Sequence, residues 1–380
     1  MSPSSSSRSA IFKALIAWGV VIFFLTAGRD FLSADMTPVT ALACFALLFA
    51  TILMASFGVV READHLAHSL GEPYGTLILT LSIVSIEVIL IAAVMLGPSD
   101  APTIARDSIF AVMMIIVNLV TGVCLIAGAL RNGEQEYNAQ GSVAFIAMIV
   151  VLTGTALILP NMAGVGDGSF LVPQAVALAL MTVVVYGAFL LLQMGRYRHH
   201  YMQPLPGRMS IRSAEASSDK PVDVSLSGGP GKNLVHAVLL LALILPIVLL
   251  AHDLAVVIDY GVARVGAPVA VGGVLIAIIV FTPESITAVK AALNNETQRA
   301  INLCLGAFVS TVGLTVPAVL TVGLLTGKKV VLGISPTETT LFALTIALTT
   351  LTYLGRRTSA TQGLLHLMLF CVYTLLLFVH

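Results

Sequence analysis

The sequence predicts an all-α polytopic membrane protein. The chain of 380 residues is 58% hydrophobic and only 10% charged, whereas soluble domains are roughly a quarter charged. Long apolar runs recur from end to end, and about 20 apolar residues are enough for a helix to cross the hydrocarbon layer. The net charge is zero, so composition gives no reason to expect a nucleic-acid partner, and we expect none.

Eleven apolar runs have the length of a membrane span. Polar connections or turns that contain glycine or proline separate most of them, and their ends are approximate. We expect spans at residues 11–27, 38–60, 74–97, 108–130, 141–160, 171–195, 233–251, 267–293, 300–326, 337–354 and 362–379.

The placement of the basic residues predicts the orientation. If the N-terminus is cytoplasmic, fourteen Lys and Arg residues fall on or near the inner side and five fall outside. This excess follows the positive-inside rule, so we place the C-terminus outside. The inner group is Arg8, Lys13, Arg61, Arg131, Arg196, Arg198, Arg208, Arg212, Lys220, Lys232, Lys290, Arg299, Arg356 and Arg357, and the outer group is Arg29, Arg106, Arg264, Lys328 and Lys329.

The first span and one long connection stand apart from the rest. The first span resembles a secretory signal, with basic residues before an apolar run, but we interpret it as an extra membrane helix after a disordered segment 1–10. Residues 196–232 are rich in Ser, Pro and Gly and are expected to form a flexible cytoplasmic linker. His199 and His200 within it are interpreted as solvated residues. The four cysteines are isolated in sequence and are interpreted as packing residues.

The linker divides the membrane part into two halves of five helices, 38–195 and 233–379. The second helix of each half carries a central glutamate, Glu87 in "SIVSIEVILI" and Glu284 in "IIVFTPESIT". Because corresponding helices are five positions apart in the order of spans, which is an odd number, the halves have opposite orientations. This arrangement predicts an inverted-repeat transporter with its site near the bilayer midplane.

A charge at the centre of a membrane helix costs about 2.5–3.5 kcal/mol on insertion scales, so two such residues indicate a functional site. Burial penalises the ionised form, and a carboxyl group in this setting can hold either a proton or a cation. We expect Glu87 and Glu284 to bind the transported cation and to carry protons. Two carboxylates balance one divalent ion, which favours calcium.

Polar side chains near the glutamates are weaker candidates for the cation site. Asn118 is an amide within an apolar span, and Pro283 perturbs the helix just before Glu284. Hydroxyl groups in membrane helices more often join helices than bind ions. The second-rank candidates are Asn118, Ser310, Thr311, Ser85 and Thr282, whereas Thr345, Thr349 and Thr352 are interpreted as packing.

Two motifs resemble the calcium/cation antiporter superfamily, in particular its bacterial calcium:proton or sodium:proton branch. The first is "ADHLAHSLGEPYGTLILTLSIVSIEV", which includes Gly71, Gly75 and Glu87, and the second is "VGGVLIAIIVFTPESITAVKAALNNETQRAINLCLGAFVSTVGLTVP". The resemblance implies a ten-helix core of two inverted repeats plus one extra helix, in a bacterial inner membrane. It also implies that Glu87 and Glu284 are the central ligands, and that a cytoplasmic cation leaves as protons enter.

The chain departs from the family pattern in front of each glutamate. In the wider family a Gly-Asn pair lies there, but here those positions are Ile83 and Val84 in one half and Val280 and Phe281 in the other. The site therefore lacks two amide ligands. Calcium takes six to eight oxygens, so sodium and potassium remain open beside it.

Three other functions compete with a cation:proton antiporter. A proton-driven transporter of organic solutes would need a larger aromatic or charged pocket. A lipid-modifying enzyme would need acidic or histidine clusters at a membrane face, where only His252, Asp253 and Asp259 are available. A channel suits two inverted halves less well than alternating access does. We therefore expect no enzyme and no cofactor, with cation, proton and lipid bilayer as partners.

Overall fold

The computed structural model describes residues 5–32, 36–70, 74–96, 101–163, 166–204, 230–268, 270–355 and 357–378. Gly71, Arg356 and most of the predicted linker lie outside the described residues. The two segments predicted to be disordered or flexible each differ from the prediction at one boundary, and α2 and α8 extend well beyond their predicted ends. Helix α1 begins at Ser5, within the segment expected to be disordered, and residues 196–204 include a 3-10 turn at Arg198–Tyr201 that packs against α6, α7 and α10.

Every predicted span corresponds to a helix. The first half contains α2 (Pro38–Leu70), α3 (Tyr74–Met95), α4 (Ile104–Met113), η2 (Met114–Val120), α5 (Thr121–Asn132), α6 (Ala139–Thr153), η3 (Gly154–Ile158), η4 (Leu159–Asn161) and α7 (Val172–Met194). The second half contains α8 (Pro230–Val265), α9 (Ala270–Leu293), α10 (Thr297–Thr326), α11 (Pro336–Tyr353) and α12 (Ala360–Leu377), and α1 (Ser5–Thr26) and η1 (Gly28–Leu32) precede both.

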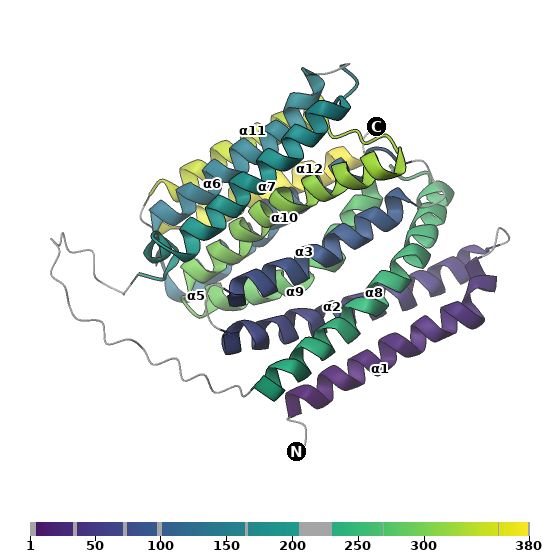
Figure 1. The fold of residues 1–380 in the computed structure, drawn as a ribbon. Coiled ribbons are helices and arrows are strands. Elements are labelled where there is room, and N and C mark those ends of the chain that lie inside the picture. The colour runs from purple at the N-terminus through teal and green to yellow at the C-terminus, as the bar shows by residue number, and fades with distance from the viewer. Residues whose placement is uncertain are drawn as a thin grey trace.

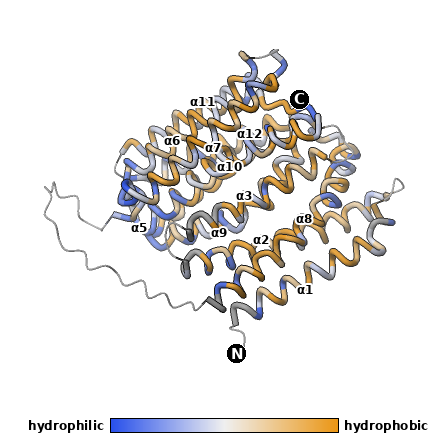
Figure 2. The backbone as a smooth tube through the Cα atoms, in the orientation of Figure 1, coloured by the Kyte–Doolittle hydropathy of each residue, from blue (hydrophilic) through white to orange (hydrophobic). Residues whose placement is uncertain are grey.

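These helices have the character of membrane spans. Within the described residues, nine helical stretches are long and apolar enough to cross a membrane, and α3 adds a shorter apolar stretch at Leu81–Met95. Threonine-rich α11 is not among the nine. The predicted span 108–130 is one continuous helix built of α4, the π-helical η2 and α5. The hydrophilic residues gather at the ends of the bundle in Figure 2, and apolar residues occupy its length. The predicted all-α membrane fold is confirmed.

Local sequence explains where some helices begin. The side chain of Ser335 accepts a hydrogen bond from the backbone N–H of Glu338, whose carboxylate accepts one from the N–H of Ser335. This capping box satisfies two backbone donors that the first turn of a helix leaves free. Pro336 occupies the first helical position of α11, where no N–H is needed.

The bundle has a central layer between two outer groups (Figure 1). Helices α1, α2 and α8 lie on one side, α6, α7, α11 and α12 lie on the other, and α3, α9 and α10 lie between them. Exposed large apolar residues are frequent on α1, α7 and α12, whose outer faces would contact lipid. A two-stranded sheet of β1 (Gln135–Glu136) and β2 (Arg357–Thr358) joins the ends of the connections before α6 and α12.

Helix packing repeats when the two halves are exchanged. Helix α3 packs against α8 and α10, as α9 packs against α2 and α4. Likewise, α7 packs against α10 as α12 packs against α5. The equivalent helices α2 and α8 run antiparallel, because Tyr260 donates to the carbonyl of Met36 at one end while Ser69 bonds Asn233 at the other. Opposite directions in equivalent helices are the arrangement expected of inverted repeats.

Candidate functional site

Glu87 lies in the middle of α3 and is completely buried. Its Oε2 atom accepts a hydrogen bond of 2.9 Å from the hydroxyl of Thr311 on α10, while its Oε1 atom has no partner among the described residues. Thr315 is buried one turn further along α10, with its hydroxyl close enough to influence the Glu87 carboxyl group but without a hydrogen bond of ordinary geometry to any described residue. An unpaired buried oxygen is costly, so this group of oxygens is typical of a binding site.

Glu284 lies at the equivalent place on α9, and the two carboxyl groups are near enough to interact electrostatically. Its Oε2 atom is buried and has no partner among the described residues. Pro283 precedes it inside the helix and has no N–H, so the carbonyl of Ile279 loses its usual helical donor. The site thus combines two carboxyl groups with hydroxyl and carbonyl oxygens.

Apolar side chains occupy the four positions where the related proteins are expected to carry Gly-Asn pairs. Ile83, Val84, Val280 and Phe281 are each at most 5% exposed. Three of them, all except Val280, line the cavity beside Glu284. The walls next to the carboxyl groups therefore contribute no side-chain oxygen.

A cavity of about 1290 Å³ leads to Glu284 from one end of the bundle. Its deeper lining includes Glu284, Thr287 and Ser310, and its outer lining includes the exposed residues Arg61 and Arg198. We call this the basic end, because Lys13, Lys290 and Arg299 also line the cavity there. Glu87 is not part of the lining, so in this conformation the cavity gives access to one carboxyl group and not to the other.

At the opposite end, the segment 328–334 after α10 links the two halves. Lys328 donates to the carbonyl of Met95 at 2.8 Å, and Arg106 donates to the carbonyl of Gly333 at 3.0 Å. Lys329 pairs with Asp167 at 2.6 Å. The hydrogen bond from Lys329, followed by those from Ser169, lowers the pKa of the Asp167 carboxyl well below its usual range. These bonds tie the segment to residues of the first half.

The hydroxyl candidates differ in their surroundings. Thr311 contacts Glu87, and Ser310 lines the cavity, where it accepts from the hydroxyl of Tyr186 and donates to the carbonyl of Gly306. Ser85 and Thr282, which occupy equivalent places in the two halves, each donate to a carbonyl of their own helix. Neither of these two residues lines the cavity, so the structure brings Thr311 and Ser310 to the site and places Ser85 and Thr282 outside it.

Asn118 belongs to a separate buried network. Its Nδ2 donates to the hydroxyl of Thr345 on α11 at 3.0 Å, and its Oδ1 lies 3.1 Å from Nδ1 of His366 on α12. His366 is completely buried, and its Nε2 lies 3.2 Å from the hydroxyl of Thr352. Two threonines interpreted as packing residues thus belong to this network: Thr345 bonds Asn118 and Thr352 bonds His366. The one sequence signal for His366 was a histidine inside an apolar span.

Glu62 is a further buried acid that the sequence did not single out. It is 0% exposed, and its Oε2 lies 2.6 Å from Nδ1 of His236, which joins α2 to α8. The ring of His65 stacks on that of His236 at a centroid distance of 5.1 Å. Glu62 does not line the cavity, so it is not a candidate cation ligand in this conformation.

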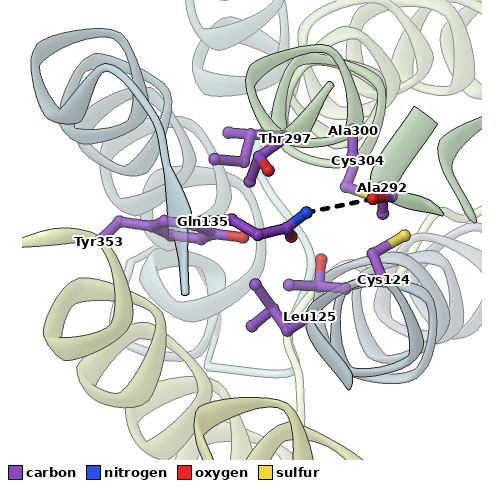
Figure 3. A pocket seen from close by; sticks show the side chains of 10 residues that line it. Cys124, Leu125, Gln135, Ala292, Thr297, Ala300, Cys304 and Tyr353 are labelled. Atoms are coloured by element: carbon purple, nitrogen blue, oxygen red, sulfur yellow. Dashed lines mark hydrogen bonds between the residues drawn. The ribbon is translucent and has the colours of Figure 1, made fainter. Parts of the chain in front are cut away.

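A second, very small cavity lies between α5, α10 and β1 (Figure 3). It measures about 10 Å³, which is close to the volume one water molecule requires. Gln135 donates to the carbonyl of Ala292 across it at 3.1 Å. Cys124 and Cys304, predicted to be isolated, lie within hydrogen-bonding reach of each other as free thiols. Among the described residues no cluster of three His, Cys, Asp or Glu side chains could hold a metal.

Comparisons with known proteins agree over most of the chain. The family described as Sodium/calcium exchanger protein matches residues 40–195 and 235–379. The putative ionic transporter y4hA of Sinorhizobium fredii (strain NBRC 101917 / NGR234) is 36% identical over 324 residues, which are 85% of each chain. The sodium-potassium/proton antiporter ChaA of Escherichia coli (strain K12) is 32% identical over 372 residues, 97% of this chain and 96% of ChaA.

The fold is also found in a solved structure. Native YfkE superposes with a TM-score of 0.71 and 14% sequence identity, over 96% of this chain and 99% of YfkE. At 14% identity, the two proteins share the arrangement of their helices, and the similarity says nothing about which ion this chain transports.

Proposed function

Because the chain belongs to the sodium/calcium exchanger family, we propose that it exports a cytoplasmic cation in exchange for protons by alternating access. It is an integral membrane cation exchanger and therefore a transporter. We propose calcium as the exported ion, sodium and potassium as further substrates, and protons as the counter-ion. Its membrane would be the bacterial inner membrane, with the N-terminus in the cytoplasm.

The observation that carries the proposal is the pair Glu87 and Glu284. The two residues come from equivalent helices of the two halves, and each has a buried oxygen without a partner among the described residues. A carboxylate in a membrane interior is stabilised either by a cation or by a proton. Because both ligands compete for the same oxygens, one must leave before the other binds, and this competition by itself produces exchange.

The cavity at the basic end supports an inward-open conformation. Basic residues are enriched on the cytoplasmic side of membrane proteins, and the mouth carries Arg61, Arg198 and Arg299. A cytoplasmic cation would reach Glu284 first. Movement of the halves would then expose the carboxyl groups to the other side, where protons replace the cation, and the protonated pair would return.

The set of oxygens bears on ion selectivity. Two carboxyl groups with the hydroxyls of Thr311, Thr315 and Ser310 supply about five oxygens if each carboxyl group binds through one oxygen, and about seven if each binds through both, against the six to eight that surround calcium. The apolar residues Ile83, Val84, Val280 and Phe281 add none, so water completes the shell when the carboxyl groups bind through one oxygen each. An ion that keeps part of its water shell fits this set, which supports sodium and potassium beside calcium. The relative ChaA, described as a sodium-potassium/proton antiporter, supports the same view.

Proton flux in proteoliposomes tests the proposal. Addition of calcium, sodium or potassium to one side should move protons across the membrane, and Glu87→Gln and Glu284→Gln should each abolish this flux. Glu134→Gln changes an exposed acid outside the cavity and serves as the matched control. Full flux in both site variants, or no flux with any cation in the wild type, would refute the proposal.

A further inference from the structure

Four basic side chains at the mouth of the cavity have no ionic partner in the described part of the chain. They are Lys13 on α1, Arg61 on α2, Arg198 after α7 and Lys290 on α9, and all four line the cavity. None forms an ion pair with another described residue. Lys13 and Arg61 are close enough to repel each other, and this repulsion affects Lys13 more strongly than its attraction to Glu62 does.

Acidic groups do not balance this charge. The cavity lining contains five basic residues, including Arg299, and two acidic ones, Asp64 and Glu284. Arg299 already pairs with Glu296 at 3.1 Å. A cleft lined by one sign of charge between low-dielectric walls concentrates its potential, so this mouth repels cations and attracts anions.

The walls next to the basic groups are apolar. Leu53, Met54 and Phe57 of α2 line one side, and Phe189 and Leu190 of α7 line the other. A free inorganic anion carries no apolar part, so it would leave these apolar surfaces exposed to water. A ligand with an anionic head and hydrocarbon chains would contact both kinds of surface.

We propose that an anionic phospholipid binds at this mouth, with its phosphate among Lys13, Arg61, Arg198 and Lys290 and its acyl chains along the apolar walls. The basic end lies where the positive-inside rule puts the cytoplasmic leaflet, and that leaflet is rich in anionic lipids. The bound phosphate neutralises the mouth, so that a cation passes to Glu284 without crossing a ring of uncompensated positive charge.

The binding test is independent of transport. The purified full-length protein in neutral detergent is titrated with phosphatidylglycerol or with phosphatidylcholine of identical acyl chains, and lipid binding is measured by native mass spectrometry. Phosphatidylglycerol should bind more tightly. Arg61→Gln and Arg198→Gln should each weaken it about fivefold, the effect expected of one basic residue at an anionic surface, and Arg61→Lys should retain most of the affinity.

Arg131→Gln is the matched control, since Arg131 is exposed at the end of α5 and does not line the cavity. The control should bind phosphatidylglycerol as the wild type does. The proposal would be overturned by equal affinity for the two lipids or by unchanged binding in both cavity variants. It would also be overturned if inorganic phosphate at equal concentration displaced phosphatidylglycerol, because the site would then bind free phosphate. Only the effect on cation passage rests on the proposed function, so lipid binding without exchange would refute that function alone.

Discussion

The hydroxyl of Thr311 donates a hydrogen bond of 2.9 Å to Oε2 of Glu87. This bond connects α10 of the second half with α3 of the first. Both residues are completely buried, so no solvent competes for the bond. One carboxyl group of the site is thus held by the other half of the protein, and a movement of the halves changes its environment directly.

Removal of this hydroxyl should weaken transport. Thr311→Val keeps the shape of the side chain but leaves Glu87 without its donor, and hydrogen bonds to charged groups contribute about 1.5–3 kcal/mol. We expect kcat/KM for the cation to fall at least about tenfold, measured as initial exchange rates in proteoliposomes. Thr311→Ser should keep most of the activity. Thr321→Val, whose hydroxyl bonds only its own helix, is the control, and equal rates in Thr311→Val and the control would contradict the expectation.

Two adjacent glycines in α9 should respond differently to a methyl group. A Cβ atom at Gly273 would lie 2.7 Å from the backbone nitrogen of Ser108 on α4, whereas at Gly272 it would find ordinary contacts of 3.4 Å and more. Overpacking of this kind costs about 1–3 kcal/mol. Gly273→Ala should lower the thermal midpoint of the detergent-solubilised protein, and Gly272→Ala should leave it nearly unchanged. Equal midpoints in the two variants would show that α4 and α9 separate easily.

The pair of Glu62 and His236 should contribute to the packing of α2 on α8. His236→Gln removes the partner of the completely buried Glu62 carboxyl group, and a buried polar group without its partner is destabilising. Glu62→Gln leaves the partly exposed His236 and should cost less. A double-mutant cycle on unfolding free energy should give a coupling energy of about 1 kcal/mol or more, in the range found for residues in contact. Additive effects of the two substitutions would show that the 2.6 Å contact contributes no coupling.

The network around Asn118 should stabilise the protein through His366. His366→Leu removes the partner of the buried Asn118 Oδ1, and an unsatisfied buried acceptor costs about 1–3 kcal/mol. The thermal midpoint should therefore fall, and His366→Gln should restore part of the loss because it keeps a donor. A wild-type midpoint in His366→Leu would indicate that the amide finds another partner.

Apolar length was sufficient to predict the positions of the membrane helices. Each span needs about 20 apolar residues for a physical reason that does not depend on its neighbours, so the spans from residue 11 to residue 379 could be located one at a time. The helix ends were less predictable, because polar residues such as Arg61 and Glu62 continue α2 to Leu70 beyond the apolar run.

Side-chain partners could not be predicted in the same way. Glu62 occurs in the polar stretch "VREADH", where nothing in the sequence singled it out, but it is completely buried and its partner His236 comes from α8. Thr345 and Thr352 formed a helical stripe typical of packing. The packing of η2 on α11 brings Asn118 to Thr345, and the packing of α12 on α11 brings His366 to Thr352.

The sequence by itself determined the membrane class, the eleven spans, the two halves and the two intramembrane glutamates, because hydrophobic length and the cost of a buried charge are properties of single segments. Only the tertiary structure decided that Thr311 contacts Glu87, that Asn118 binds His366 instead of facing the cavity, and that the cavity reaches Glu284 alone. These relationships join residues more than 200 positions apart in the chain or depend on how whole helices pack, and no local pattern contains that information.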